Sequence, residues 1–323
     1  MAADAPHFRV MRLISGYWLS QAVYVAAKLG LADLVADGSK SVDELASLTG
    51  THPEALYRLL RALASVGVFR EEAGRFAQTD ESACLRTGPA TQRALAIMNG
   101  EEHYRAYGEL LHSVRTGAPA FDKVYGEGVF DWLGKHPEAA ATFDLAMVGV
   151  HGTESAAIAE GYDFSGIRTL VDVGGGNGSL LSAIKAKWPH LKGVLFDLPH
   201  VVERASLPDG CERVAGSFFD SVPAGGEAYL MRHIIHDWDE PRCLTILGHI
   251  RKTGGKVLVA EGVVPVGNGP SFTKLLDLTM LAIPGGKERT EAEYADLFGR
   301  VGFKLARIVP TRSEVSVIEG VPA

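Results

Sequence analysis

The stretch "LVDVGGGNGSL", from Leu170 to Leu180, decides the fold of the second half of the chain. The apolar run over 168–173 predicts a short buried strand, and the apolar spacing over 179–187 predicts a helix. Four glycines separate these elements, at positions 174, 175, 176 and 178. Glycine allows positive φ and lets a ligand approach the main chain, and the helix behind the turn offers free N–H groups. The stretch therefore predicts a nucleotide-binding turn rather than a glycine-rich turn without a ligand.

The identity of the nucleotide is less well defined by this turn. A dinucleotide fingerprint needs glycine or alanine where this chain has Ser179, although Gly174 and Gly176 fit the pattern. Asp197, at the end of the next predicted strand, stands where an acid would hold an adenosine ribose. NAD and S-adenosylmethionine both carry that ribose, so these residues predict an adenosine cofactor and leave both possibilities open.

Composition and charge are those of an ordinary globular protein. The 323 residues suffice for two domains with separate cores, and 46% hydrophobic and 22% charged residues are typical values. A net charge of −7 argues against nonspecific binding to nucleic acid. Cys84, Cys211 and Cys243 are far apart and odd in number, which indicates neither a disulfide framework nor a zinc site and favours a reducing, cytoplasmic setting. No signal peptide is expected, and polar residues interrupt the apolar stretch over 13–35, so no membrane span is expected either.

Residues 1–100 have the pattern of a winged helix. A helix or two over 8–36 break at Gly30, and two short helices and a hairpin around Gly74 follow. Each short helix has a predicted capping box, Ser41 with Glu44 and Thr51 with Glu54. Ten basic and ten acidic side chains cancel over this region, whereas a DNA-binding domain needs a basic face. We therefore predict a dimerisation domain and keep a DNA-binding regulator as the alternative.

The rest of the chain changes character near residue 166. Residues 101–165 are predicted to be helical, and strands then alternate with helices, at 169–173, 193–197, 211–215, 227–233 and 256–261. This alternation predicts a doubly wound parallel sheet in a domain over 166–323. The tail adds a hairpin with its turn at 311–313, which is unlike most dinucleotide-binding folds and typical of a seven-stranded methyltransferase sheet.

Several segments together resemble the S-adenosylmethionine-dependent small-molecule O-methyltransferases, such as plant caffeic acid methyltransferases and bacterial enzymes of polyketide and phenazine tailoring. These segments are "DVGGGNG", "FDLPHVVERA", "YLMRHIIHDWDE", "KVLVAEGVVP" and "GGKERTEAEYADLFGRVGF". The resemblance spans nearly the whole chain, and "HDW" followed by "GGKERT" is its most specific part. It implies an α/β fold: a Rossmann-like seven-stranded class I methyltransferase domain with an N-terminal all-helical winged-helix dimerisation domain, active as a homodimer.

The resemblance also implies a role for individual residues. Residues expected to bind S-adenosyl-L-methionine, and its product S-adenosyl-L-homocysteine, are Gly174, Gly176, Gly178, Asp197, Leu198, Ser217, Phe218 and Arg232. His236 is expected to be the general base, flanked by Glu261 and Glu288. The helical segment over 101–165 is expected to contribute to the substrate pocket, whose walls would include Phe143, Met147, Met280 and Ile283. No metal is expected.

These residue types suit methyl transfer to a phenol. The sulfonium donor is already activated, so the enzyme has to align donor and acceptor. It must also remove a proton from a hydroxyl whose pKa is near 10. A histidine can take that proton, and a carboxylate on its other nitrogen would fix the tautomer and stabilise the imidazolium.

The two histidines of "RHIIHDW" have simpler alternatives. His236 precedes a predicted helix that Asp239 or Glu240 would cap, with Pro241 in its first turn, so His236 could instead close that turn. His233 with His236 invites a zinc interpretation. Odd spacing on a strand would point the two rings to opposite faces, which argues against a shared metal.

Ser217 departs from the family pattern, which has an acid there to accept from the adenine amino group; a hydroxyl accepts without charge. We predict an O-methyltransferase that acts on a phenolic or similarly acidic hydroxyl of a small aromatic or polyketide-type metabolite. The alternative is a relative that binds the cofactor but catalyses decarboxylation, hydroxylation or cyclisation, and the presence of His236 favours methyl transfer. A nicotinamide oxidoreductase is disfavoured by Ser179 and the C-terminal hairpin.

Overall fold

The computed structural model describes residues 5–88 and 91–323, which divide into two compact units. The first unit ends at Gly108 and resumes over Phe130–Gly152. The second unit comprises Glu109–Val129 and Thr153–Ala323. The helical segment over 101–165 is therefore shared between the units.

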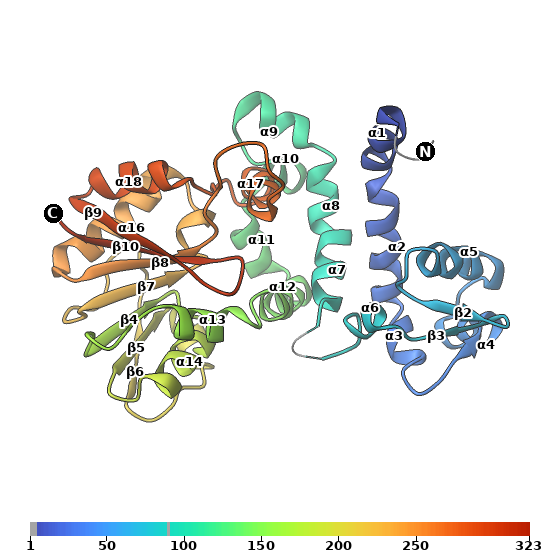
Figure 1. The fold of residues 1–323 in the computed structure, drawn as a ribbon, viewed down its shortest axis with the longest axis horizontal. Helices are drawn as coiled ribbons and strands as arrows, with labels where there is room; N and C mark the ends of the chain where they lie inside the picture. Colours follow the sequence, from blue (N-terminus) through green and yellow to red (C-terminus); the bar gives the residue numbers. More distant parts are fainter. Residues whose placement is uncertain (1–4, 89–90) are drawn as a thin grey trace. The chain divides into compact units, whose positions relative to one another are not determined.

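The first unit begins with the predicted winged-helix region (Figure 1). Gly30, with φ of 66°, ends the long N-terminal helical stretch, as expected from the sequence. Three short antiparallel strands in the described residues form a sheet of order β1-β3-β2, so "all-helical" describes this region incompletely. Its elements are α1 (Pro6–Ile14), α2 (Gly16–Lys28), α3 (Leu31–Leu34), β1 (Lys40–Ser41), α4 (Val42–Thr49), α5 (Pro53–Ala64), β2 (Arg70–Glu72), β3 (Arg75–Ala77) and α6 (Asp80–Ala83).

One of the two predicted capping boxes is confirmed. The Ser41 side chain accepts from the N–H of Glu44, whose carboxylate accepts from the N–H of Ser41. The box with Thr51 is wrong, because α5 begins at Pro53 and His52 is its N-cap. Proline at the first helical position has a preset φ and no N–H to satisfy, which moves the helix start past Thr51.

Helix α7 is the main contact among the remaining helices of the first unit. This helix (Arg93–Gly100) lies against both α2 and α12 (Pro137–Val150). A Cβ on Gly100 would overlap the ring of Tyr24, so this close approach of α2 requires glycine. The other helices of this unit are α8 (Glu102–Tyr107) and α11 (Val129–Lys135). The first residue of α11, Val129, belongs to the second unit.

The second unit is built on a sheet that has seven strands among the described residues, in the order β6-β5-β4-β7-β8-β10-β9 (Figure 1). The first five in this order pair in parallel, and β10 pairs antiparallel with both β8 and β9. This confirms the predicted sheet and its closing hairpin. The strands are β4 (Thr169–Val173), β5 (Lys192–Asp197), β6 (Cys211–Ala215), β7 (Ala228–Arg232), β8 (Lys256–Glu261), β9 (Phe303–Pro310) and β10 (Ser316–Pro322).

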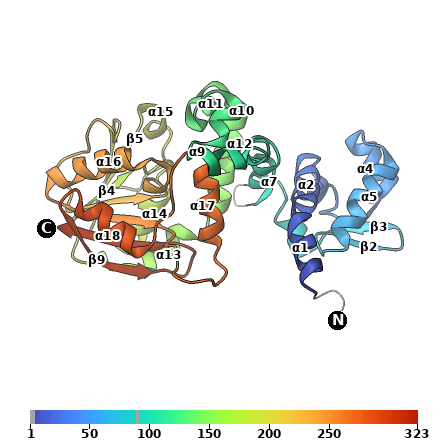
Figure 2. The ribbon, with the colours of Figure 1, turned by 90° about the horizontal axis from the view of Figure 1, so that it is seen from above.

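Helices cover both faces of this sheet (Figure 2). Successive side chains of a strand point to opposite faces, so Leu170 packs with α13 and α14 while Val171 packs with α16 and α18. The helices α9 and α10 both contact α17. The helices of this unit are α9 (Leu110–Thr116), α10 (Ala120–Tyr125), α13 (Glu154–Gly161), α14 (Ser179–Lys187), α15 (Pro199–Val202), the 3₁₀ turn η2 (Ile235–Asp237), α16 (Glu240–Thr253), α17 (Phe272–Ala282) and α18 (Glu291–Gly299). Across residues 5–88 and 91–323, no helix combines the length and the apolar character needed to cross a membrane.

Candidate active site

The glycine turn lies at the carboxyl end of β4, an inner strand of the sheet. Gly174, Gly176 and Gly178 have φ of 70°, 57° and 81°, a left-handed conformation that side chains with a Cβ rarely adopt. A Cβ on Gly176 would meet no atom within 4 Å, so the main chain of the turn is open on that side. The turn leads directly into α14, as predicted. A ligand can therefore approach the main chain of Gly176 closely.

Asp197, at the end of β5, is joined to this turn. Its Oδ2 accepts from the N–H of Gly176 at 2.9 Å, and its Oδ1 accepts from the N–H of Leu198 at 2.7 Å. Leu198 is 44% exposed, which leaves an apolar side chain beside the carboxylate. The structure thus brings together three of the residues that the sequence assigned to the cofactor.

Asp172, on β4 beneath the turn, is a residue that the sequence analysis did not single out. It is buried, and a Cβ on Gly175 would lie 2.7 Å from its Oδ2. That oxygen has no hydrogen-bond partner among the described residues. Burial raises the pKa of Asp172 to about 7. The nearby charge of Asp197 adds to this rise, and the charge of Arg232 opposes it. An acid within an otherwise apolar buried strand was the feature of the sequence that could have revealed it.

The surroundings of the turn suit a cationic ligand better than a diphosphate. A buried carboxyl beneath the turn would repel phosphate oxygens, whereas a cation would stabilise its ionised form. S-adenosylmethionine carries a sulfonium and an ammonium group, and an adenosine with two ribose hydroxyls. Asp172 and Asp197 therefore both fit this cofactor, and the buried carboxyl of Asp172 disfavours NAD.

The other predicted cofactor residues lie at the carboxyl ends of neighbouring strands. Phe218 lies against the turn, because a Cβ on Gly174 would be 3.6 Å from its ring. The Oγ of Ser217 accepts from the N–H of Phe219 at 3.2 Å. Arg232 donates through Nη1 to Oγ of Ser155, at an N–O distance of 2.8 Å.

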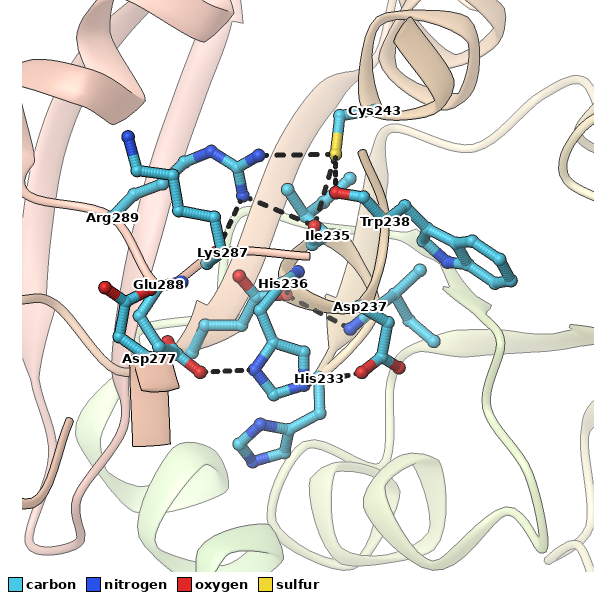
Figure 3. Close-up of polar contacts among 12 residues, drawn as sticks. His233, Ile235, His236, Asp237, Trp238, Cys243, Asp277, Lys287, Glu288 and Arg289 are labelled. Atoms are coloured by element: carbon cyan, nitrogen blue, oxygen red, sulfur yellow. Dashed lines mark hydrogen bonds and ion pairs between the residues drawn. The ribbon is translucent and has the colours of Figure 1, made fainter. Parts of the chain in front are cut away.

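His236 lies in a tight turn that follows β7 (Figure 3). The strand ends at Arg232, and η2 then carries the buried His236 side chain. Its Nδ1 is 2.6 Å from Oε1 of Glu288, and its Nε2 is 3.5 Å from Oδ1 of Asp237. Each ring nitrogen therefore faces a carboxylate.

The charges around His236 raise the pKa of its imidazole by more than burial lowers it. Burial alone would lower the pKa of the imidazole, but Asp237, the hydrogen bond to Glu288 and the charge of Glu261 raise the pKa of His236 to about 10. Burial also raises the pKa of Asp237, to about 6, against the effect of the His236 charge. The site is thus built to hold a proton on His236 firmly, at about the proton affinity of a phenol.

Glu261 reaches the main chain of this turn rather than the ring. Its Oε1 accepts from the N–H groups of Ile234 and His236, each at 3.1 Å. Its Oε2 accepts from the hydroxyl of Tyr294 at 2.6 Å. Of the two glutamates predicted to flank His236, only Glu288 is hydrogen-bonded to the imidazole.

The two histidine rings do not point to opposite faces, so that prediction is wrong. The ring centroids of His233 and His236 are 4.9 Å apart. The side-chain alternation of a strand ends at Arg232, and His233 has φ of 54°. Asp239 does cap α16, since its Oδ1 accepts from the N–H of Arg242 at 2.9 Å and Pro241 lies in the first turn.

The "GGKERT" segment is bound to the "HDW" segment through the main chain. The N–H of Lys287 donates to the carbonyl oxygen of His236 at 2.8 Å. The N–H of Glu288 donates to Oδ1 of Asp277 on α17 at 2.9 Å. These bonds set Glu288 opposite the imidazole, which gives a physical reason for the two motifs to occur together.

The predicted substrate residues are divided between the units. Met280 and Ile283, on and after α17, are buried in the second unit. Phe143 and Met147 lie on α12 in the first unit, where Phe143 packs edge-on against Phe130. Contact of these four residues with a substrate stays a prediction.

Comparison with family models accounts for most of the chain. Residues 107–304 match the O-methyltransferase domain, and residues 11–88 match the O-methyltransferase dimerisation domain. The chain is 45% identical to the phenazine O-methyltransferase PhzM of Lysobacter antibioticus over 97% of this chain and 95% of that protein.

Solved structures agree with this match. A crystal structure of LaPhzM superposes with a TM-score of 0.93 at 44% identity, and covers 99% of this chain and 100% of that one. The O-methyltransferase NcsB1 from neocarzinostatin biosynthesis, in complex with S-adenosylmethionine and 2-hydroxy-5-methyl naphthoic acid, superposes with a TM-score of 0.82. It is 36% identical, and the match covers 94% of this chain and 96% of that one.

Proposed function

This chain belongs to the family of S-adenosylmethionine-dependent O-methyltransferases, and we propose that it methylates a phenolic hydroxyl of a small aromatic or polyketide-type metabolite with His236 as general base. One observation carries the proposal: Nδ1 of the buried His236 lies 2.6 Å from Oε1 of the buried Glu288. A buried imidazole with a carboxylate on one nitrogen is suited to take a proton on the other.

We assign cofactor binding to the residues around the glycine turn. When bound, S-adenosylmethionine supplies an electrophilic methyl group on a sulfonium. Gly174 and Gly178 give the turn its left-handed conformation, and Gly176 lets a ligand approach the main chain. Asp197 can accept from the ribose hydroxyls. Leu198, Ser217 and Phe218 would surround the adenine, with Arg232 nearby. Asp172 extends this set, since its buried carboxyl favours a cationic group above it.

In the proposed mechanism His236 accepts the phenolic proton at Nε2. Glu288 holds the proton on Nδ1, which leaves Nε2 as the acceptor in the neutral imidazole and stabilises the imidazolium that forms. With a pKa of about 10, His236 matches a phenol in proton affinity, so the neutral imidazole can take the phenolic proton at little cost, and the fraction of enzyme in this form rises with pH up to about 10. Glu261 acts through the main chain of the turn.

The acceptor is proposed from the apolar side chains assigned to the pocket and from the relatives. Met280 and Ile283, both buried in the second unit, offer a thioether and an aliphatic chain, which suit a planar aromatic molecule. Among the similar proteins, PhzM is named as a phenazine O-methyltransferase, and NcsB1 is solved with a hydroxylated naphthoic acid bound.

We further propose a cytoplasmic homodimer. The dimerisation-domain match over residues 11–88 supports the dimer. Helix α1 has no buried residue, and it exposes large apolar side chains such as Leu13 (80%) and Ile14 (70%). Exposed apolar patches of this kind mark association surfaces. The three cysteines are free, in keeping with a reducing compartment.

The test combines binding and turnover. Calorimetric titration should give binding of S-adenosylhomocysteine and none of NAD. Hydroxylated phenazines and naphthoates should then be methylated on oxygen, with the product identified by mass spectrometry. Substituting His236→Ala should lower kcat by about 100-fold or more and leave cofactor affinity within about twofold. The control is His190→Ala, at an exposed histidine of the same unit.

Two outcomes would overturn the proposal. Normal turnover of the His236→Ala enzyme would remove the base role. Binding of S-adenosylhomocysteine without methylation of any hydroxylated aromatic acceptor would favour the non-methylating alternative.

A further inference from the structure

We infer that Tyr294 and Arg289 are positioning residues for His236, which hold the main chain of its turn without touching the imidazole. Tyr294 acts through Glu261, and Arg289 acts through the carbonyl oxygen of Ile235. The inference rests on the proposed role of His236 as the base.

The turn over 233–238 has little internal support. His233 has φ of 54°, a conformation that costs a residue other than glycine about 1–3 kcal/mol and persists only where the surroundings enforce it. The η2 turn is three residues long. A main-chain bond within the turn is long, from the N–H of Asp237 to the carbonyl oxygen of Ile234 at 3.3 Å. The conformation must therefore be held by neighbouring elements.

Glu261 and Tyr294 hold the N–H side of the turn. Both side chains are fully buried. Glu261 accepts from two main-chain N–H groups of the turn through Oε1, and from the Tyr294 hydroxyl through Oε2. Burial raises the pKa of Tyr294 well above its usual value, so its hydroxyl stays a donor. The Tyr294 bond fixes the second oxygen of the carboxylate, and so orients the first toward the turn.

Arg289 holds the carbonyl side of the turn (Figure 3). Its buried guanidinium donates through Nη1 to the carbonyl oxygens of Ile235 at 3.3 Å and Lys287 at 3.0 Å. Its Nη2 lies 3.5 Å from Sγ of Cys243, whose thiol donates to the same Ile235 oxygen at 3.2 Å. One rigid guanidinium thus joins the turn of His236 to the segment of Glu288.

A pair of tyrosine substitutions tests the inference. Tyr294→Phe removes the hydroxyl that donates to Glu261. The matched control is Tyr229→Phe, because Tyr229 is equally buried in the same unit and donates to the carbonyl of Pro223 at 2.7 Å. Tyr294→Phe removes one buried hydrogen bond. Tyr229→Phe removes two, since the Tyr229 hydroxyl also accepts from the N–H of Gly226 at 3.2 Å, so the control should lose at least as much stability.

Only Tyr294→Phe should affect the chemistry. We expect kcat to fall about 10-fold with KM within about twofold, since a small misplacement of a catalytic group slows the reaction without weakening binding. The amides of Ile234 and His236 should exchange hydrogen faster in Tyr294→Phe than in Tyr229→Phe, because their acceptor is no longer fixed. Unchanged kcat and unchanged exchange in Tyr294→Phe would overturn the inference.

A second variant, Arg289→Lys, tests the same inference in case Tyr294→Phe does not fold. Arg289→Lys keeps the charge but loses the planar fork, and it should give the same fall in kcat and the same faster exchange. If Tyr294→Phe does not fold, Arg289→Lys decides the question by these measurements. The two proposals can be overturned independently of each other. Normal turnover of the His236→Ala enzyme would show that His236 is not the base. Amide exchange measures how firmly the turn is held, and this does not depend on the role of His236.

Discussion

Gly286 lies so close to His236 that a Cβ on residue 286 would overlap the main-chain carbonyl oxygen of His236. The same oxygen accepts from the N–H of Lys287 at 2.8 Å. The missing side chain of Gly286 thus allows two segments to meet along their main chains, and this contact sets the base opposite Glu288.

Gly286→Ala should therefore separate His236 from Glu288. The added methyl group must push main chain away, which costs on the order of 1–3 kcal/mol in stability. We expect kcat to fall by about 100-fold, because the imidazole and its carboxylate shift apart. Thermal unfolding and steady-state kinetics measure the two effects.

The matched control is Gly248→Ala within α16. A Cβ on Gly248 would meet no atom within 4 Å, and alanine favours a helix interior, so this variant should gain about 0.5–1 kcal/mol and keep its kcat. Wild-type kcat in Gly286→Ala would show that the close approach does not position the base.

Glu288→Gln should move the pH dependence of the reaction. Glu288 helps raise the pKa of His236, so the neutral amide lowers that pKa. The base then loses its proton at a lower pH, and the rising limb of kcat/KM moves toward lower pH. The maximum rate falls, because the imidazolium has lost its anionic partner.

Kinetics from about pH 6 to pH 11 would measure this shift, with Glu314→Gln, at an exposed carboxylate between β9 and β10, as the control. If the rising limb of the kcat/KM profile stays in place or moves toward higher pH in Glu288→Gln, the role assigned to Glu288 is contradicted.

Binding of S-adenosylhomocysteine near pH 7 should release protons. The pKa of Asp172 is raised to about 7, so the carboxyl is partly protonated before binding. The ammonium group of the ligand, placed over Asp172, would lower that pKa and drive the proton off. Titration calorimetry in two buffers of different ionisation enthalpy counts the protons. Asp172→Asn should abolish the release and weaken binding, whereas equal proton counts in both proteins would exclude Asp172 as their source.

Leu13→Glu should weaken the proposed homodimer. Leu13 is 80% exposed on α1, where a charge would be buried by association and would lack a partner. Light scattering after size exclusion, over a dilution series, should show dissociation at a higher concentration than for the wild type. Val266→Glu, at a loop residue that is 96% exposed, is the control. A Leu13→Glu protein that remains as dimeric as this control would place the interface elsewhere.

Much of the catalytic fold follows from short-range sequence patterns. Buried parallel strands are continuous apolar runs bounded by turns, and for this reason the prediction over 169–173 coincides with β4. The Thr51 capping box failed because Pro53 starts the helix more effectively than a threonine side chain. The opposite placement of His233 and His236 failed because strand periodicity was applied beyond the end of β7.

The sequence by itself determined the glycine turn, the strands and the residue types of the site, because each depends on neighbours a few positions away. Only the tertiary structure decided which atoms meet. Glu288 reaches the imidazole of His236 across 52 positions, and Glu261, 25 positions from His236, reaches its main chain instead. The burial of Asp172 beneath the turn was likewise settled by packing. Contacts between distant segments depend on how strands and helices pack, and no local pattern of the chain encodes those distances.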